Sequence, residues 1–390
     1  MDEATEVNRQ YQRLLEATDA LYRRLEPDDD DRRAHVTTLL EVLQSAVAVS
    51  LPEPPPPTTP PPGPGDGAGA DVLRDGDPSE ETVRSWLSTL KTWGRWGSDD
   101  DRGTLNHIGA EQRTAAARLV TGAMTVSCSA RVTYRRPNHG LEDVPVHGIH
   151  PSWATPFRFV VQDGADARDH TARHSAYDAF LIAPHGAKVT HLDAPAHTVL
   201  DGRVYGGATA TSDLNAGVRG TIETVTDGVF GRGVLLDVAR TRGVDWLDDG
   251  DAIRPEDLDA AEQAGGVRVG RGDVLFVRTG YRRRMPDGPV ERFAGRPGLQ
   301  ASCLPWLYER EVAVLGADVA TDVVPHGYAL GMPVHTVGMW AMGLWLIDNC
   351  DLERLGNVCA ERGRYEFATV LAPLMLAGGT GSPMNPLALF

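Results

Sequence analysis

Residues 184–197 read PHGAKVTHLDAPAH and hold three of the twelve histidines of this 390-residue chain. The four residues 190–193 alternate like a short strand, so the side chains of His191 and Asp193 are expected on the same face. Their Cα atoms would then lie roughly 6–7 Å apart, close enough for an imidazole and a carboxylate to bind one cation. This stretch therefore predicts a metal site built on a strand.

His197 and His185 can join such a site only where the chain turns on both sides of the strand. In an unbroken strand, His197 would lie roughly 20 Å from His191. Pro195 lacks the N–H that a sheet needs, and Gly186 permits a bend, so we expect a turn, a strand and a second turn. The alternative is a histidine-rich loop whose side chains hydrogen-bond to the backbone.

The stretch resembles the motif HxGTHxDxPxH of the cyclase superfamily, which includes bacterial kynurenine formamidase, isatin hydrolase and some polyketide ring cyclases. The first histidine of the motif falls at Ala187 in this chain. A longer branch of the family has the pattern HGxxxTHxDA, in which His185 takes that place. The second half of the motif is matched at Thr190, His191, Asp193, Pro195 and His197.

Two further segments resemble the longer branch: TWGRWGSDDDRGTLNHI at residues 92–108 and GRYEFATVLAPLMLAGGTGSPMNPLALF at residues 363–390. The resemblance runs from about Trp93 to Phe390. It implies that the first segment closes over the site, with Trp93 and Trp96 against the substrate, and ordinary packing is the alternative. Arg278 ends an apolar run and is expected either to hold a substrate carboxylate or to pair with an acid.

The remaining informative histidine is His335, in the segment PVHTVGMWAMGLWLIDNCDLERL at residues 333–355. In one continuous helix, His335 and Asp348 would lie about 20 Å apart. A break at Gly343 followed by a returning strand would bring them together. The family has glutamate thirteen residues after this histidine, and Asp348 stands there with a side chain one methylene shorter. A helix cap and a solvated acid are the alternative interpretation.

The resemblance implies one or two divalent cations. His185, His191 and Asp193 would hold the first, and Asp193 would bridge to a second held by His335 and Asp348. Imidazole and carboxylate ligands without thiolate suit Zn²⁺ or Mn²⁺. Such a cation lowers the pKa of its water towards about 7 and so yields hydroxide. His197, with an ordinary pKa near 6.5, is then the candidate general base and acid.

Three functions remain open at this point. The first is a metal-dependent hydrolase of the C–N bond in a small aryl formamide, lactam or related amide. The second is a ring-forming cyclase or dehydratase of natural-product biosynthesis, of the polyketide type. The third is a non-catalytic family member that acts as a binding or assembly protein, which the departures at Ala187 and Asp348 favour.

The composition narrows the choice of partners. A formal net charge of −16 opposes binding to nucleic acid, so a small-molecule substrate is expected. No apolar run approaches membrane-spanning length and no secretory signal pattern begins the chain, which predicts a cytoplasmic protein without a membrane partner. The four cysteines form no CxxC pair, so neither a structural zinc site nor a disulfide framework is expected.

Three parts are expected along the chain. Residues 1–50 predict a pair of amphipathic helices, residues 51–78 a Pro- and Gly-rich linker, and residues 79–390 the catalytic domain. The helical pair has apolar stripes that must pack on the main body, on a second copy or on a partner protein. A homodimer is expected.

Within the catalytic part, apolar patterns predict strands at 125–133, 231–238 and 273–279, and helices at 110–119 and 255–264. Asp259 and Glu262 are expected on the exposed side of the last helix. The resemblance implies an α/β fold, a mixed β-sheet or barrel with flanking helices like the swivelling β/β/α fold of the cyclases.

Overall fold

The computed structural model of the chain describes residues 73–132, 157–162, 177–210, 218–285 and 295–390. The expected helical pair and the linker up to residue 72 lie outside these residues and stay predictions. The chain divides into two compact units, one of Met1–Gly63 with Tyr134–Ala183 and one of Pro64–Thr133 with Pro184–Phe390. The described part of the first unit is an antiparallel hairpin of β2 (Phe157–Gln162) and β3 (Tyr177–Leu181).

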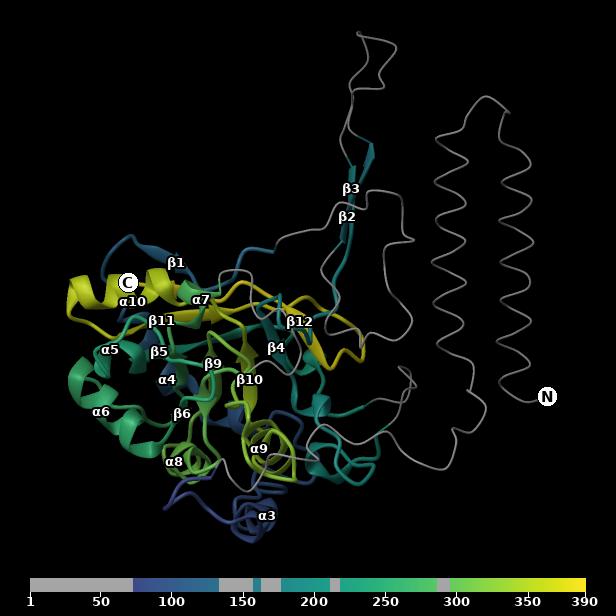
Figure 1. Ribbon diagram of the computed structural model, residues 1–390. Helices are drawn as coiled ribbons and strands as arrows, with labels where there is room; N and C mark the ends of the chain where they lie inside the picture. The colour runs from purple at the N-terminus through teal and green to yellow at the C-terminus, as the bar shows by residue number, and fades with distance from the viewer. Residues whose placement is uncertain (1–72, 133–156, 163–176, 211–217, 286–294) are drawn as a thin grey trace, which may run out of the picture. The chain divides into compact units, whose positions relative to one another are not determined.

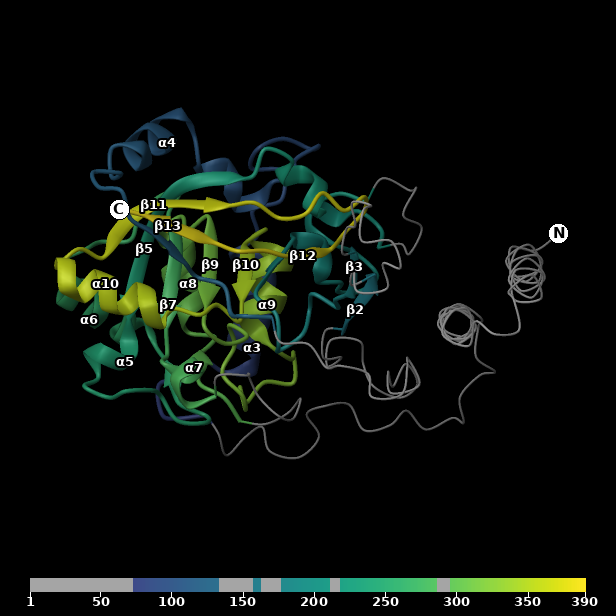
Figure 2. The same ribbon diagram turned by 90° about the horizontal axis from the view of Figure 1, so that it is seen from above.

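The second unit is built on a nine-stranded mixed sheet with the order β1-β13-β11-β5-β7-β9-β10-β4-β12 (Figure 1). Its four central strands, β5, β7, β9 and β10, are parallel, and the strands on either side pair antiparallel. Seen from above, the sheet is curled (Figure 2). A separate parallel pair joins β6 and β8. The strands of this unit are β1 (Thr125–Ser127), β4 (His191–Asp193), β5 (Val229–Asp237), β6 (Ala252–Ile253), β7 (Val274–Arg278), β8 (Gly298–Leu299), β9 (Val314–Ala317), β10 (Trp345–Asp348), β11 (Glu366–Leu371), β12 (Gly381–Pro383) and β13 (Leu387–Leu389).

Helices flank this sheet, and together they give the mixed α/β class that the sequence predicts. The described helices are α3 (Glu80–Thr89), η1 (Gly103–His107), α4 (Ala110–Ala117), η4 (Pro195–His197), η5 (Tyr205–Gly207), η6 (Ile222–Val225), α5 (Val238–Thr241), α6 (Pro255–Gly265), α7 (Tyr281–Arg284), α8 (Cys303–Glu309), α9 (Pro333–His335), η7 (Thr336–Ala341) and α10 (Glu353–Arg362). Among the described residues, no helix is both long and apolar enough to cross a membrane.

The central strands are buried on both faces. In β7, Leu275 and Val277 join a core that includes side chains of α3, α6, α8 and η7. The alternate residues Val274 and Phe276 join a second core that includes side chains of α10. This two-sided burial explains the continuous apolar runs of β5 and β7, which confirm the strands predicted at 231–238 and 273–279.

Other predictions hold in part. α4 and α6 confirm the helices expected at 110–119 and 255–264. β1 is shorter than the predicted strand, because Cys128 leaves the ladder and its carbonyl accepts from the backbone of Asp351. The expected exposure of Glu262 is wrong: this side chain is buried and accepts from the backbone N–H of Val269 and from Arg310.

The chain reverses at Gly343, between η7 and β10. Gly343 has a φ of +67°, and a Cβ there would lie 2.6 Å from the ring of Tyr205. A left-handed conformation with no room for a side chain requires glycine. The predicted break is confirmed, and it returns the chain along β10 toward His335.

Candidate metal centre

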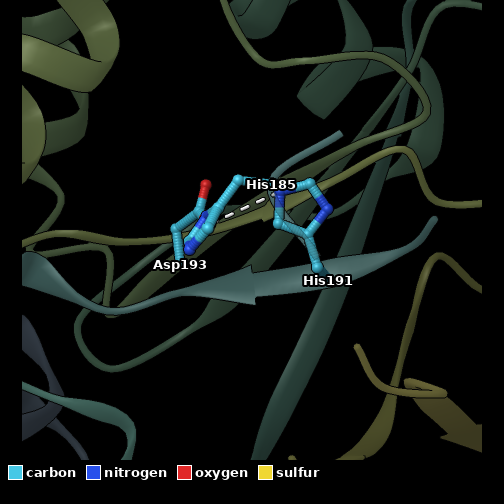
Figure 3. Close-up of side chains that lie close together, drawn as sticks. All are labelled: His185, His191 and Asp193. Atoms are coloured by element: carbon cyan, nitrogen blue, oxygen red, sulfur yellow. Dashed lines mark hydrogen bonds and ion pairs between the residues drawn. The ribbon is translucent and has the colours of Figure 1, made fainter. Parts of the chain in front are cut away.

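β4 carries the first two side chains of the candidate centre. The strand lies between β10 and β12 and pairs antiparallel with both, so its backbone is fixed within the sheet. Leu192 packs into the second core. His191 and Asp193, on either side of it, point together the opposite way (Figure 3), with 3.4 Å between Nε2 of His191 and Oδ1 of Asp193. The expected shared face is confirmed.

His185 reaches the same point from the loop before β4. Its Nδ1 lies 2.7 Å from Oδ1 of Asp193, and its Nε2 lies 3.0 Å from the hydroxyl of Thr380. This approach requires Gly381, because a Cβ there would lie 2.3 Å from Cε1 of the His185 ring. His185 thus joins His191 and Asp193 in one cluster, although this part of the chain departs from the usual motif.

A second cluster shares Asp193 with the first. Nε2 of His335 lies 3.3 Å from Oδ2 of Asp348 and 3.9 Å from Oδ2 of Asp193. Asp193 therefore directs one oxygen to His185 and His191 and the other to His335. In each group of three, the candidate ligand atoms all lie within 4.8 Å of one another, a spacing that could hold a metal ion.

Hydrogen bonds orient these ligands. Oδ1 of Asp348 accepts from the hydroxyl of Thr321 at 2.7 Å and from its backbone N–H at 3.2 Å, which leaves Oδ2 for the cluster. Nδ1 of His335 lies 2.6 Å from Oδ2 of Asp322. A backbone carbonyl lies 2.8 Å from Nδ1 of His191. Both imidazoles therefore present Nε2 to the centre, as metal-binding histidines with a second partner do.

The sequence analysis did not single out Asp322 or Thr321. They follow β9, whose carboxyl end lies beside that of β10. Ligand sites of open α/β sheets gather at the carboxyl ends of parallel strands. The apolar run of β9 was not among the predicted strands, and an acid shortly after such a run is the signal that could have found Asp322.

The buried charges of the cluster balance one another. Burial opposes the charge of His191, but the carboxylates of Asp193 and Asp348 outweigh it and raise the pKa of His191 to about 9. The pKa of His335 is likewise raised against its burial by Asp348 and Asp322. Burial alone would raise the pKa of Asp193, yet the nearby histidines lower it. The carboxylates therefore stay charged, and their charge is balanced by protonated His191 and His335 or by a cation that replaces those protons.

His197 lies against the cluster but belongs to neither group of candidate ligands. After Pro195 the chain turns through η4, and the His197 ring stacks on that of His185 with centroids 3.9 Å apart and planes at 7°. Burial lowers the pKa of His197 to about 4, despite the attraction of Asp193. This pKa is below the ordinary 6.5, so the imidazole is unprotonated at pH 7 but is a weaker base than an ordinary histidine.

The two expected substrate tryptophans are packed against other aromatic groups. The indole N–H of Trp93 donates to the carbonyl of Trp340 at 2.7 Å, and the two rings lie 4.5 Å apart. Trp96 meets the ring of His107 edge on, at 5.1 Å. Within the described residues, the ring contacts of Trp93 and Trp96 do not reach the clusters, so their role toward a substrate stays a prediction.

Arg278 pairs with acids, the second of the two roles considered for it. Its guanidinium donates to Asp237 at 2.7 Å and to Glu353 at 2.9 and 3.0 Å. It lies outside both groups of candidate ligands.

The donor set fits a divalent cation. Three imidazoles and two carboxylates, nearly all buried, converge with one carboxylate positioned between the two groups. The four cysteines are buried free thiols and belong to neither group. Nitrogen and oxygen donors without thiolate are typical of hydrolytic zinc and manganese sites. The fold and this centre are those of an α/β enzyme with a candidate site for divalent cations.

Comparisons with known proteins identify the family. A family model described as "Putative cyclase" matches residues 106–323. A crystal structure described as a novel cyclase is 31% identical, has a TM-score of 0.68, and the match covers 78% of this chain and 99% of that one. The chain therefore belongs to the cyclase family, as its motifs predict.

A solved structure with lower sequence identity has a similar fold. Isatin hydrolase A from Ralstonia solanacearum is 18% identical with a TM-score of 0.50, and the match covers 72% of this chain and 97% of that one. No curated protein matches the chain.

Proposed function

We propose that the chain is a metal-dependent hydrolase of the C–N bond in a small aryl formamide, lactam or related amide. The observation that carries this proposal is the pair of clusters that share Asp193, with the imidazole of His197 stacked on His185 beside them. Isatin hydrolase A has a similar fold, and its name describes the hydrolysis of isatin, which is a lactam. This likeness supports the choice of substrate class.

Each side chain has a role in this proposal. His185, His191 and Asp193 would hold one cation, and Asp193, His335 and Asp348 would hold a second. A divalent cation bound there would make water more acidic and polarise the substrate carbonyl.

His197 accepts the proton of the attacking water and returns it to the leaving nitrogen. Water thus adds across the C–N bond and yields a carboxylic acid and an amine. No serine or cysteine nucleophile is needed.

The direct test is to incubate the metal-loaded protein with N-formylkynurenine or with isatin. Release of formate or opening of the lactam is the expected result, and protein dialysed against a chelator should be inactive. Full metal loading without turnover of either compound would count against hydrolysis.

A second candidate is a ring-forming or dehydrating enzyme, in which the same cation and base would stabilise an enolate. The crystal structure at 31% identity, described as a cyclase, favours it. Mass spectrometry separates the two: hydrolysis of a lactam adds the mass of one water and hydrolysis of a formamide gives formate and a lighter amine, whereas cyclisation leaves the mass unchanged or removes one water.

Zinc or manganese is the proposed metal, and a homodimer in the cytoplasm is the proposed state of the protein. Metal analysis of the purified protein and its mass by light scattering would test these points.

A further inference from the structure

A small recess lies next to the candidate metal centre. It is lined by Ala187, two residues after His185, and by Asn349, which directly follows Asp348. Its other polar lining residues are Tyr281, Arg282, Arg296 and Asp318. The recess has room for about one water molecule.

Arg296 is the unusual residue of this recess. Its side chain is buried, with 8% exposure, and its backbone exchanges two hydrogen bonds with Val324. Within the described part of the chain, its guanidinium makes no hydrogen bond or close ion pair, and its Nε is buried without a partner. By contrast, the buried Arg278 donates to Asp237 and Glu353. A buried cation without a bonded partner is costly to the fold, so a group outside the chain is expected to complete it.

The nearby acids do not pair with Arg296. Asp318 lines the recess, but its carboxylate accepts from Thr279 and from the backbone of Gly280. Asp348 and Asp322 lie within electrostatic range of Arg296. Both are already engaged: Asp322 accepts from Val334 and His335, and Asp348 accepts from Thr321 and faces His335.

Binding of a cation at Asp348 would cancel its charge and leave Arg296 in a more positive field. That change favours an anion in the recess.

We propose that Arg296 binds a carboxylate of the substrate and so selects anionic substrates. A guanidinium fork matches the two oxygens of a carboxylate. The hydroxyl of Tyr281, which makes no hydrogen bond within the described residues, can add a neutral donor. Room for one water admits the tip of a carboxylate, while the rest of the substrate lies toward the metal centre. The substrate class is then an amide or formamide that carries a carboxylate close to the reacting carbonyl. This assignment rests on the proposed function for the nature of the reacting group.

The first experiment measures binding. Anthranilate and its neutral analogue 2-aminobenzamide are titrated by calorimetry into the metal-loaded protein, as wild type, Arg296→Met and Arg296→Lys. We expect the wild type to prefer anthranilate at least tenfold, Arg296→Met to lose the preference, and Arg296→Lys to keep part of it. An exposed arginine, Arg84, supplies the control variant Arg84→Met. Equal affinity for both compounds, absence of anthranilate binding, or an unchanged preference in Arg296→Met would overturn the proposal.

The melting temperature separates ligand binding from a structural role. If Arg296 serves to bind a ligand, Arg296→Met without ligand should melt at the same temperature as the wild type or at a higher one. Its metal content should be unchanged. A marked fall in melting temperature together with loss of metal would assign Arg296 to the structure and overturn the proposal.

Hydrolysis assays test the anion site and the proposed hydrolase function separately. N-formylanthranilate carries the carboxylate and formanilide lacks it. Turnover of both compounds at equal efficiency, insensitive to Arg296→Met, would support hydrolysis and overturn the anion site. Binding of anthranilate through Arg296 with hydrolysis of neither compound would uphold the anion site and count against hydrolysis.

Discussion

Asp193 is the side chain on which both halves of the candidate centre depend. Its two oxygens face different histidines, Oδ1 toward His185 and His191 and Oδ2 toward His335. The sequence placed it beside His191 through the period of two in a strand. It is buried at 1% exposure, so a cation or protonated histidines must balance its charge.

Removal of Asp193 and removal of His197 should have different effects. Asp193→Ala takes a ligand from both groups, so it should lose the metal and the activity. His197→Ala removes no candidate ligand, so it should keep the metal and lose activity by roughly 10²–10⁴-fold. Metal content by mass spectrometry and turnover, measured on the same samples, check this pair. Retained turnover in His197→Ala would remove His197 from its assigned role.

Asp322 should tune the metal without binding it. It accepts from the backbone and Nδ1 of His335 and so fixes the direction of Nε2. Asp322→Asn should weaken metal affinity by about 10–100-fold, because partners behind a ligating histidine typically have this effect. Competition with a chromophoric chelator measures the affinity. Unchanged affinity would show that the histidine is oriented by packing alone.

Because of His107, we expect the folded protein to lose stability in acid. It is buried at 3% exposure, and burial lowers its pKa to about 4, although Glu311 opposes this shift. Between pH 6.5 and 4 the unfolded chain binds the proton more readily, so the stability present above pH 6.5 is lost as the pH falls through this window. The loss at pH 5 is about 2 kcal/mol. Urea unfolding of wild type and His107→Phe at pH 7.5 and pH 5 checks this, and equal losses in the two proteins would contradict it.

The crossing of two loops at Gly103 and Gly343 holds η1 against the start of β10. A Cβ at Gly103 would lie 2.2 Å from the carbonyl oxygen of Gly343, and both residues have positive φ. The carbonyl of Gly343 also accepts from the backbone of Thr104 at 3.0 Å. Because β10 ends in Asp348, this crossing supports the position of a candidate ligand.

Gly343→Ala should destabilise the protein by about 3 kcal/mol, from backbone strain and from the clash with Tyr205. Gly202→Ala is the matched control, since Gly202 has a φ of +70° and a Cβ added there would meet nothing within 4 Å, so it should cost only about 1 kcal/mol. Chemical denaturation compares the two variants. Equal losses would show that the clash relaxes without cost.

Local sequence patterns predicted individual strands and turns well, but they did not predict which segments contact one another. The break at Gly343, the strand at His191 and the turn at Pro195 follow from residue types within a few positions. The partners of these elements do not. Thr380, which contacts His185, is 195 residues away along the chain, and Asp322 bonds His335 across a separate loop. Such contacts depend on strand order, which periodicity does not encode.

In the second unit, the nine-stranded sheet gathers the site from distant parts of the sequence. β4 sits between β10 and β12, so that segments near residues 191, 348 and 381 become neighbours. The family motifs predicted which residues form the two clusters, and the α/β class followed from the same resemblance. Arg296 lies in no motif. Its unusual feature is that its side chain has no hydrogen-bond partner among the described residues, and only the folded chain reveals this.

The central claim is that His191 and Asp193 bind a divalent cation. The most direct measurement is an anomalous-scattering map from crystals of the protein grown with Mn²⁺ or Zn²⁺. We predict a peak within ligand distance of Nε2 of His191 and Oδ1 of Asp193, with a second peak between Asp193 and Asp348 when both positions fill. A map with no peak near these two atoms, from protein supplied with either metal, would contradict the claim.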